Sequence, residues 1–514
     1  MGEAVSLRRT EPVRWAKVID QTRCIGCHAC STACKSENQV PLGVHRTYVK
    51  YVDVGRFPQA RRAFQVTRCN QCAEPPCVYA CPTAAMHQRP DGIVDFDKSV
   101  CIGCKACIAA CPYDAIFINP EDHSAEKCNF CAQRLDVGLE PACVVVCPTE
   151  AIVVGDLNDG TSRVSEIVGR DAVAVRRPEK ATKPKLFYKG AHQATLDPIA
   201  ARRPPGGLFL WSEQPAGPQL VASGHPGSPN NSAAAMLSYD VAHRAPWDFR
   251  VSLYTWTKGI ASGAYLLPAL LVLAGAASPS GALWRSAAPI LGGGFLAATV
   301  GLLILDLTHP ARFYLVLTRP QWRSWLARGG VILSLYGAVL VAHFLAALGG
   351  RDEWPRALVF LGVPLAVLSA VYTAWLFAQA KARDLWQSPL LPPQLLVQAC
   401  ASGAAALLPI AAVVEPGATR PLAVCAEAAT ALHLLLIVGE VTVGHATAHA
   451  RLAAREMTSG RYRWFLRSGM ALQAAGVLAV VGEAPLALVT LAILAGLLAY
   501  EHAFVQAGQS VPLA

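Results

Sequence analysis

The spacing of cysteine constrains this chain more than any other feature. Sixteen of its eighteen cysteines lie between Cys24 and Cys147, in four groups of four. Two groups share the spacing C-x2-C-x2-C-x3-C, and the other two are longer variants of it. The sixteen are Cys24, Cys27, Cys30, Cys34, Cys69, Cys72, Cys77, Cys81, Cys101, Cys104, Cys107, Cys111, Cys128, Cys131, Cys143 and Cys147. Such repeated clustering predicts metal ligation rather than a disulfide framework.

Thiolates are ligands for iron-sulfur clusters and also for zinc. Three cysteines on a tight loop reach three corners of one cubane, while the fourth, at the start of a helical turn, ligates the other cluster of a pair. Zinc ribbons do not repeat this pattern, and sixteen thiolates complete four cubanes with none left over. Gly26 and Gly103 leave room for backbone N–H groups to turn toward the sulfurs. We therefore expect four [4Fe-4S] clusters, with structural zinc as the alternative.

The order of the four groups resembles the iron-sulfur subunits of the complex iron-sulfur molybdoenzyme family (DmsB, PsrB and NrfC), over roughly residues 15–180. The resemblance implies that the first group pairs with the fourth and the second with the third. It assigns one cluster to each of four sets: Cys24, Cys27, Cys30 and Cys147; Cys34, Cys128, Cys131 and Cys143; Cys69, Cys72, Cys77 and Cys111; Cys81, Cys101, Cys104 and Cys107.

The second half of the chain consists of long apolar runs. A window of about twenty apolar residues can cross a bilayer, and eight such windows are present. They lie at 252–276, 286–308, 325–348, 356–380, 392–414, 421–444, 467–482 and 485–504. Only Gly482–Pro485 separates the last two, which makes them the hardest to divide.

Charge in the short loops predicts the orientation of these spans. Loops on the side of the N-terminal domain carry Arg312, Arg319, Arg323, Arg328, Lys381, Arg383, Arg451, Arg455, Arg461, Arg463 and Arg467, whereas the opposite loops carry Arg285, Arg351, Arg356 and Arg420. Because Lys and Arg favour cytoplasmic loops, we expect a multi-pass protein of the cell inner membrane with its cysteine-rich domain in the cytoplasm. The opening residues, with Arg8 and Arg9 but no apolar stretch, predict no export signal. The net charge of +10 has this topological origin, so nucleic-acid binding is not expected.

Together these patterns predict an α+β ferredoxin-like double dicluster domain followed by an all-α transmembrane bundle of eight helices. We expect the ferredoxin-like domain at 1–180, a Pro/Gly-rich linker at 181–247 and the transmembrane domain at 248–514. Within the linker, the apolar patch Leu208–Trp211 either docks on a domain or makes a local contact.

A second resemblance lies in the membrane half. The stretches 306–313 (DLTHPARF), 318–325 and 372–391 resemble the signature of the polysulfide reductase membrane subunit (NrfD/PsrC) family, with Thr308 and His309 as departures. The resemblance implies a quinone, menaquinone or ubiquinone, bound between the first four helices, and no haem. Ionisable residues inside spans usually mark function. Lys258, Asp306, His309 and Arg312 are therefore candidates to bind the quinone carbonyl and move protons; alternatively, Lys258 and Arg312 reach the interface and Asp306 pairs with one of them.

The two resemblances together imply a subunit of a quinone-linked oxidoreductase. Its clusters would pass electrons between the membrane quinone pool and a molybdopterin-containing catalytic subunit, with molybdenum or tungsten, which acts on a sulfur compound or an oxyanion. Alternatives are the membrane arm of a hydrogenase or of an alternative quinol-oxidising complex, or a passive anchor without quinone. An ion-translocating module using Glu427, His433, Glu440 and Glu483 is a further alternative.

Overall fold

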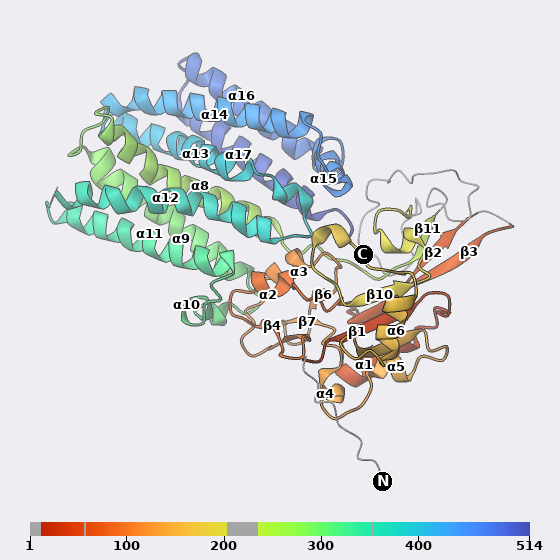
Figure 1. The fold of residues 1–514 in the computed structure, drawn as a ribbon. Helices are drawn as coiled ribbons and strands as arrows, with labels where there is room; N and C mark the ends of the chain where they lie inside the picture. The colour runs from red at the N-terminus through yellow and green to blue at the C-terminus, as the bar shows by residue number, and fades with distance from the viewer. Residues whose placement is uncertain (1–11, 56–57, 203–234, 352, 514) are drawn as a thin grey trace, which may run out of the picture. The chain divides into compact units, whose positions relative to one another are not determined.

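The structure, a computed structural model, describes residues 12–55, 58–202, 235–351 and 353–513. Arg8, Arg9 and the patch Leu208–Trp211 lie outside the described residues. The chain forms two compact units: Met1–Arg244 with Pro512–Ala514, and Ala245–Val511. The first is a mixture of strands and short helices and the second is a bundle of long helices (Figure 1).

Two sheets support the first unit. The four-stranded sheet has the order β8 (Ile152–Asp156), β1 (Trp15–Asp20), β10 (Leu186–Lys189), β9 (Val173–Ala174). Its central strand β1 runs antiparallel to β8 and parallel to β10. The three-stranded sheet has the antiparallel order β11 (Met236–Tyr239), β2 (Thr47–Val54), β3 (Arg61–Arg68).

Two small hairpins repeat one local design. The first joins β4 (Met86–Gln88) to β5 (Val94–Phe96), and the second joins β6 (Ile116–Ile118) to β7 (Ala125–Lys127). Each follows a short helix that carries cysteines, α2 (Pro76–Ala80) or α3 (Ala106–Ala110). The other helices of this unit are α1 (Ala29–Asn38), α4 (Ala132–Leu135), α5 (Ala142–Val145), α6 (Arg163–Arg170) and α7 (Gln193–Leu196).

The segment expected as a linker contributes structure to the first unit. Strand β10 pairs with β1 and strand β11 pairs with β2, although both lie within 181–247. The physical reason is that short alternating stretches such as Leu186–Lys189 complete the open edge of a sheet. The described unit therefore extends to Arg244 rather than ending near residue 180.

The second unit contains eight helices long and apolar enough to cross a membrane, counted over the described residues. They are α8 (Phe249–Leu273), α9 (Ala288–Asp306, preceded by a π-helical turn at Leu283–Ala287), α11 (Trp325–Leu348), α12 (Glu353–Gln379), α13 (Leu391–Val414), α14 (Thr419–Thr442), α16 (Arg463–Val481) and α17 (Leu486–Gln509). Two short helices, α10 (Leu315–Thr318) and α15 (Ala448–Thr458), lie in loops. The predicted fold class and eight spans are confirmed, and the turn at residues 482–485 separates α16 from α17.

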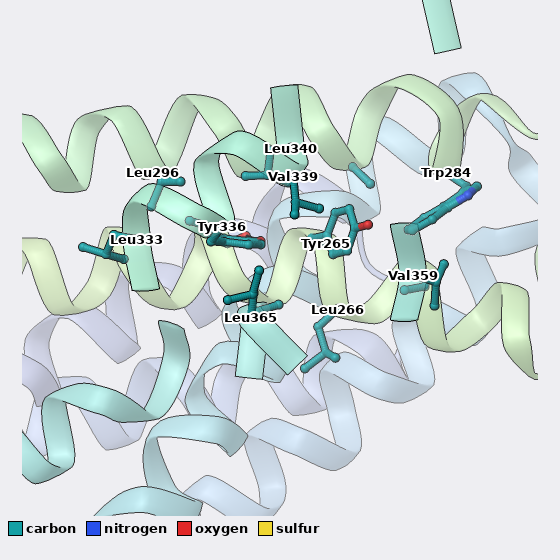
Figure 2. Packing of buried hydrophobic residues seen from close by; sticks show 14 of the residues in the cluster. Tyr265, Leu266, Trp284, Leu296, Leu333, Tyr336, Val339, Leu340, Val359 and Leu365 are labelled. Atoms are coloured by element: carbon teal, nitrogen blue, oxygen red, sulfur yellow. The ribbon is translucent and has the colours of Figure 1, made fainter. Parts of the chain in front are cut away.

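Helices α8, α9, α11 and α12 enclose one apolar core, and α8 also packs against α13 and α17. In Figure 2, Tyr265 of α8 and Tyr336 of α11 lie within this core among aliphatic side chains. The Tyr336 hydroxyl donates to the Ala261 carbonyl at 2.8 Å. His343 packs edge-on against Trp284 at 4.5 Å between ring centroids, in keeping with a packing role. In such apolar, close-packed surroundings an ionisable side chain is costly to bury.

Candidate functional site

Four thiols line a cavity beside helix α1 in the first unit. They come from the loop before α1, from α1 itself and from the residues after α5: Cys24, Cys27, Cys30 and Cys147. Gly26 in this loop has a φ of +69°, and a Cβ at this position would lie 2.3 Å from the Phe64 ring. Only glycine fits there. The four thiols are those that the resemblance assigns to one cluster.

A second group of thiols includes Cys34, one helical turn after Cys30 on α1. Cys34 is within electrostatic reach of Cys128, Cys131 and Cys143, the four that the resemblance assigns to the neighbouring cluster. The Asn38 side-chain amide faces two of their sulfurs, 3.7 Å from Cys34 Sγ and 3.8 Å from Cys131 Sγ.

Two further cavities lie beside helices α2 and α3. One is lined by Cys69, Cys72, Cys77 and Cys111, and the other by Cys81, Cys101, Cys104 and Cys107. In each cavity three thiols belong to one motif and the fourth to its partner motif. Backbone N–H groups of Met86 and Ala125 donate to Cys81 and Cys101, both at 3.4 Å. The three cavities thus each bring together thiols of two different motifs.

Burial sets the acidity of these thiols. It raises the pKa of Cys30 to about 11 and the pKa values of Cys34 and Cys72 to about 12, with neighbouring thiols adding to the effect. Cys143 differs: burial opposes its thiolate, but the adjacent Arg68 and Lys17 outweigh burial and lower its pKa to about 7. Most of these thiolates need a bound cation to exist at neutral pH, which suits a metal cluster.

The arrangement of the thiols can be compared with the requirements of a single zinc ion and of an iron-sulfur cluster. Within the described ranges, no three Cys, His, Asp or Glu side chains stand close enough together to hold a single metal ion. Zinc requires four ligand atoms at about 2.3 Å from one point. Thiols arranged around a cavity fit a polynuclear cluster better, because each thiolate then binds a different metal atom.

The membrane unit contains a small cavity lined by two charged residues. It lies between α8, α12, α13 and α17 and has room for about one water molecule. Its polar lining comprises Thr255, Lys258, Gln398, Ser402 and Glu501. Lys258 and Glu501 are 1 % and 5 % exposed. Such burial of opposite charges inside transmembrane helices is costly and indicates a functional site.

Each of these two charges has its own hydrogen-bond partners. Lys258 Nζ donates to the Ala370 carbonyl at 2.8 Å and to Thr373 Oγ1 at 2.6 Å. Glu501 accepts from Thr255 Oγ1 at 3.2 Å. Lys258 therefore does not reach the membrane interface, which was the alternative expectation for it.

The other expected quinone residues lie where α9 ends. Asp306 is the last residue of α9 and is 7 % exposed, whereas His309 and Arg312, in the following turn, are half-buried. Tyr254 of α8 is within electrostatic reach of Asp306 and Glu501 and approaches the Thr373 hydroxyl. Tyr254 is thus a buried phenol near both Asp306 and Glu501.

Glu501 and Tyr254 were not among the residues expected from the sequence. The signal for Glu501 was present, because an acidic residue interrupts the apolar run of the last span. Its partnership with Lys258, 243 positions earlier in the chain, depends on the packing of α17 against α8.

A chain of polar side chains extends from this cavity into α14 and α16. Gln398, which lines the cavity, contacts His433 at 2.9 Å, and His433 contacts Gln473 at 2.6 Å. Beside it, the Tyr500 hydroxyl donates to Glu440 at 3.0 Å. The Tyr500 ring packs edge-on against His433 at 4.9 Å between ring centroids, so Glu440 lies beside this chain.

Comparison with known proteins supports two assignments. Residues 61–157 match the family model of the 4Fe-4S dicluster domain, and residues 238–505 match that of polysulphide reductase, NrfD. The second match covers the membrane unit and more than half of the chain. It accords with the eight apolar helices and marks a multi-pass membrane protein.

The first unit has curated relatives. It is 44 % identical over 204 residues to the B subunit of tetrathionate reductase from Salmonella typhimurium, covering 39 % of this chain and 80 % of that protein. It is 41 % identical over 177 residues to the B subunit of polysulfide reductase from Wolinella succinogenes, covering 34 % of this chain and 93 % of that protein. It is 35 % identical over 224 residues to the arsenate respiratory reductase iron-sulfur subunit ArrB of a Shewanella species, covering 34 % of this chain and 96 % of that protein. The chain therefore belongs to the family of electron-transfer iron-sulfur subunits, joined in one polypeptide to a membrane domain of the polysulphide reductase NrfD family.

Proposed function

We propose that this protein passes electrons through four [4Fe-4S] clusters between a separate catalytic subunit and a quinone in the membrane. The observation that carries the proposal is the gathering of sixteen cysteines into four groups of four, each mixing three thiols of one motif with one of another. Cys24, Cys27, Cys30 and Cys147 would hold one cluster, with the other three sets as given above. Each cluster supplies one-electron chemistry when bound, and the protein positions the clusters and adjusts their potentials.

The cluster content is tested by elemental analysis. Anaerobically purified full-length protein should contain four irons and four acid-labile sulfides for each of the four clusters, and little zinc. A colourless preparation rich in zinc would overturn this part of the proposal. Cys81→Ser and Cys147→Ser should each affect one cluster and leave the others detectable by electron paramagnetic resonance.

We place the quinone head group near the end of α9, in contact with Asp306, His309 or Arg312, with the buried cation Lys258 as a further candidate contact. A quinone that takes up two electrons also takes up two protons. The buried carboxylate, phenol and ammonium groups of Asp306, Tyr254, Lys258 and Glu501 are suited to exchange those protons within an apolar bundle.

Oxidation of a soluble quinol analogue by the complete complex tests the quinone site. Asp306→Asn should lower the rate strongly. Arg420→Gln, at the start of α14 on the opposite side of the bundle, is the control and should change the rate little. Unchanged quinol oxidation in Asp306→Asn, together with normal iron content, would favour a passive anchor.

The catalytic partner is proposed from the relatives. Their names mark them as subunits of tetrathionate, polysulfide and arsenate reductases, and the resemblance to molybdoenzyme subunits suggests a partner with a molybdenum or tungsten pterin. The large protein that copurifies with this chain should contain one of these metals. Their absence would favour the membrane arm of a hydrogenase or an alternative quinol-oxidising complex.

The cytoplasmic location of the first unit is also proposed. It is supported by the arginine-rich loops at the end of the bundle where α8 begins, which include Arg451, Arg455 and Arg463. Protease added to inside-out membrane vesicles should digest the first unit, and protease added to right-side-out vesicles should not.

Proton translocation is a second candidate function, favoured by the polar chain Gln398–His433–Gln473 beside Tyr500 and Glu440. Glu427 and Glu483, the other residues considered for such a path, are half-buried and exposed, respectively. Proton uptake into sealed vesicles during quinol oxidation tests this candidate, and it should be lost in His433→Leu if the path operates.

A further inference from the structure

Two buried cations converge on one cysteine of the first unit. Arg68, the last residue of β3, donates through Nη1 to Cys143 Sγ at 2.9 Å. Lys17 of β1 approaches the same sulfur through Nζ at 3.7 Å. Arg68 is 2 % and Lys17 is 1 % exposed. Both charges are therefore screened weakly by solvent, and their effect on a neighbouring charge is large.

Over the described part of the chain, neither cation forms an ion pair with a carboxylate, and the side chains of both contact Cys143. Lys17 Nζ lies 4.0 Å from the centroid of the Phe130 ring. Arg68 Nε and Nη2 are buried and have no hydrogen-bond partner among the described residues. A guanidinium buried at this cost with donors to spare needs an anion, and the thiolates around it supply the negative charge.

The two cations act unequally on the two clusters proposed for this region. Arg68 is within electrostatic reach of thiols in both sets, including Cys30 and Cys143. Lys17 acts on Cys131 and Cys143, which belong to one set only. In the other set, the donor to Cys147 is the neutral backbone N–H of Ala151, at 3.2 Å.

We propose that Arg68 and Lys17 raise the reduction potential of the cluster held by Cys34, Cys128, Cys131 and Cys143. An electron shared between this cluster and the neighbouring one, held by Cys24, Cys27, Cys30 and Cys147, would then reside on the first. This inference rests on the proposed cluster content. Reduction adds one negative charge to a cluster, and adjacent cations and sulfur-directed hydrogen bonds stabilise the reduced form. Arg68 and Lys17 stabilise this added charge electrostatically and do not ligate metal.

Redox titration of the full-length protein, followed by electron paramagnetic resonance, tests the inference. In Arg68→Gln and in Lys17→Gln, the signal of one cluster should move to lower potential and the other signals should move less. We expect each substitution to change the reduced-to-oxidised ratio of that cluster at least tenfold at fixed potential, which is about 59 mV for a one-electron couple. The signal is assigned by its perturbation in Cys143→Ser.

Two further variants make the outcome decisive. Arg62→Gln is the matched control, because Arg62 lies on the same strand but is exposed and pairs with Asp53; it should leave all potentials unchanged. Arg68→Lys keeps the positive charge, so the reduction potential of this cluster should lie closer to the wild-type value than in Arg68→Gln. If Arg68→Gln fails to assemble clusters, the potentials measured in Lys17→Gln and Arg68→Lys test the inference instead.

Unchanged potentials in Lys17→Gln and Arg68→Gln with full iron and sulfide content would overturn the inference, as would an equal shift in Arg62→Gln. A wild-type protein that lacks iron and sulfide would instead overturn the proposed function, so the two failures are distinguishable.

Discussion

His243 illustrates how a single buried residue joins distant parts of the first unit. Its ring lies between two carboxylates, with Nε2 3.0 Å from Asp240 Oδ1 and Nδ1 in contact with Asp114. Burial lowers the pKa of His243, but Asp240 and Asp114 outweigh burial and raise it to about 10. Since Asp114 follows the cysteine group that ends at Cys111, this ion pair attaches the segment after β11 to the cluster-binding core.

The pH dependence of stability follows from this pKa. The folded pKa of about 10 exceeds the unfolded value of about 6.5. The stabilisation is therefore complete below about pH 6.5 and is lost as the pH rises to about 10. His243→Gln should cost about 3 kcal/mol at neutral pH and remove this dependence. Denaturant unfolding at several pH values measures this dependence of the free energy of unfolding. The control is His87→Gln, which should have little effect because the His87 ring contacts a neutral carbonyl.

Glu501 is the residue on which proton exchange in the membrane unit is expected to depend. Glu501→Gln keeps the size of the side chain and the hydrogen bond with Thr255 but removes the exchangeable proton. Because a positioned acid or base contributes about 100-fold or more to a proton-transfer step, quinol oxidation should slow by at least tenfold with unchanged cluster content. Glu456→Gln, at a half-buried glutamate on α15, is the control, and an equal loss there would count against a specific role for Glu501.

At the scale of elements, α8 and α13 cross at a pair of glycines. A Cβ on Gly263 would lie 1.8 Å from the Ala399 carbonyl oxygen, and a Cβ on Gly403 would lie 2.2 Å from the Gly263 carbonyl carbon. Small residues at such crossings let helix backbones approach closely within the membrane. The same approach brings Gln398 of α13 to the cavity that holds Lys258 of α8.

Substitution at this crossing should separate the two helices. Gly263→Val should lower the thermal unfolding temperature in detergent and cost about 3 kcal/mol or more, since overpacking against backbone cannot be relieved by a side-chain rotation. Gly293→Ala on α9 is the control, because a Cβ there meets nothing within 4 Å. Equal thermal stability of the two variants would show that the crossing tolerates a wider spacing.

At the scale of the whole molecule, the two units are stabilised differently. A hydrophobic cluster of the first unit includes six of the proposed ligands, among them Cys77, Cys81 and Cys107. The second unit has apolar cores made by long helices. Metal removal should therefore unfold the first unit, because closely packed thiols lose the cations that hold them together.

Oxidative removal of the clusters in detergent tests this difference. The strand contribution to the circular dichroism spectrum should fall and the first unit should become sensitive to trypsin, whereas the helical signal of the membrane unit should persist. Loss of most of the helical signal at the same step would contradict independent stabilisation of the two units.

The sequence alone determined the features that depend on local pattern. The cysteine spacing predicts cluster-binding loops because the ligands of a cubane lie a few residues apart, and the apolar windows predict eight helices because a bilayer requires about twenty apolar residues in a row. The grouping of thiols between distant motifs came only with the family resemblance, since spacing does not specify which loops meet.

Only the tertiary structure decided the features that depend on contact between distant segments. No motif in the sequence singles out Lys17 or Arg68, yet strands β1 and β3 bring both side chains to one sulfur. Strands β10 and β11 lie in a stretch expected to be a linker, and Glu501 meets the Lys258 cavity only because α17 packs against α8. The physical reason is the same in each case: the energy of a buried charge or of a paired strand is set by its neighbours in space, and those neighbours are far away in the chain.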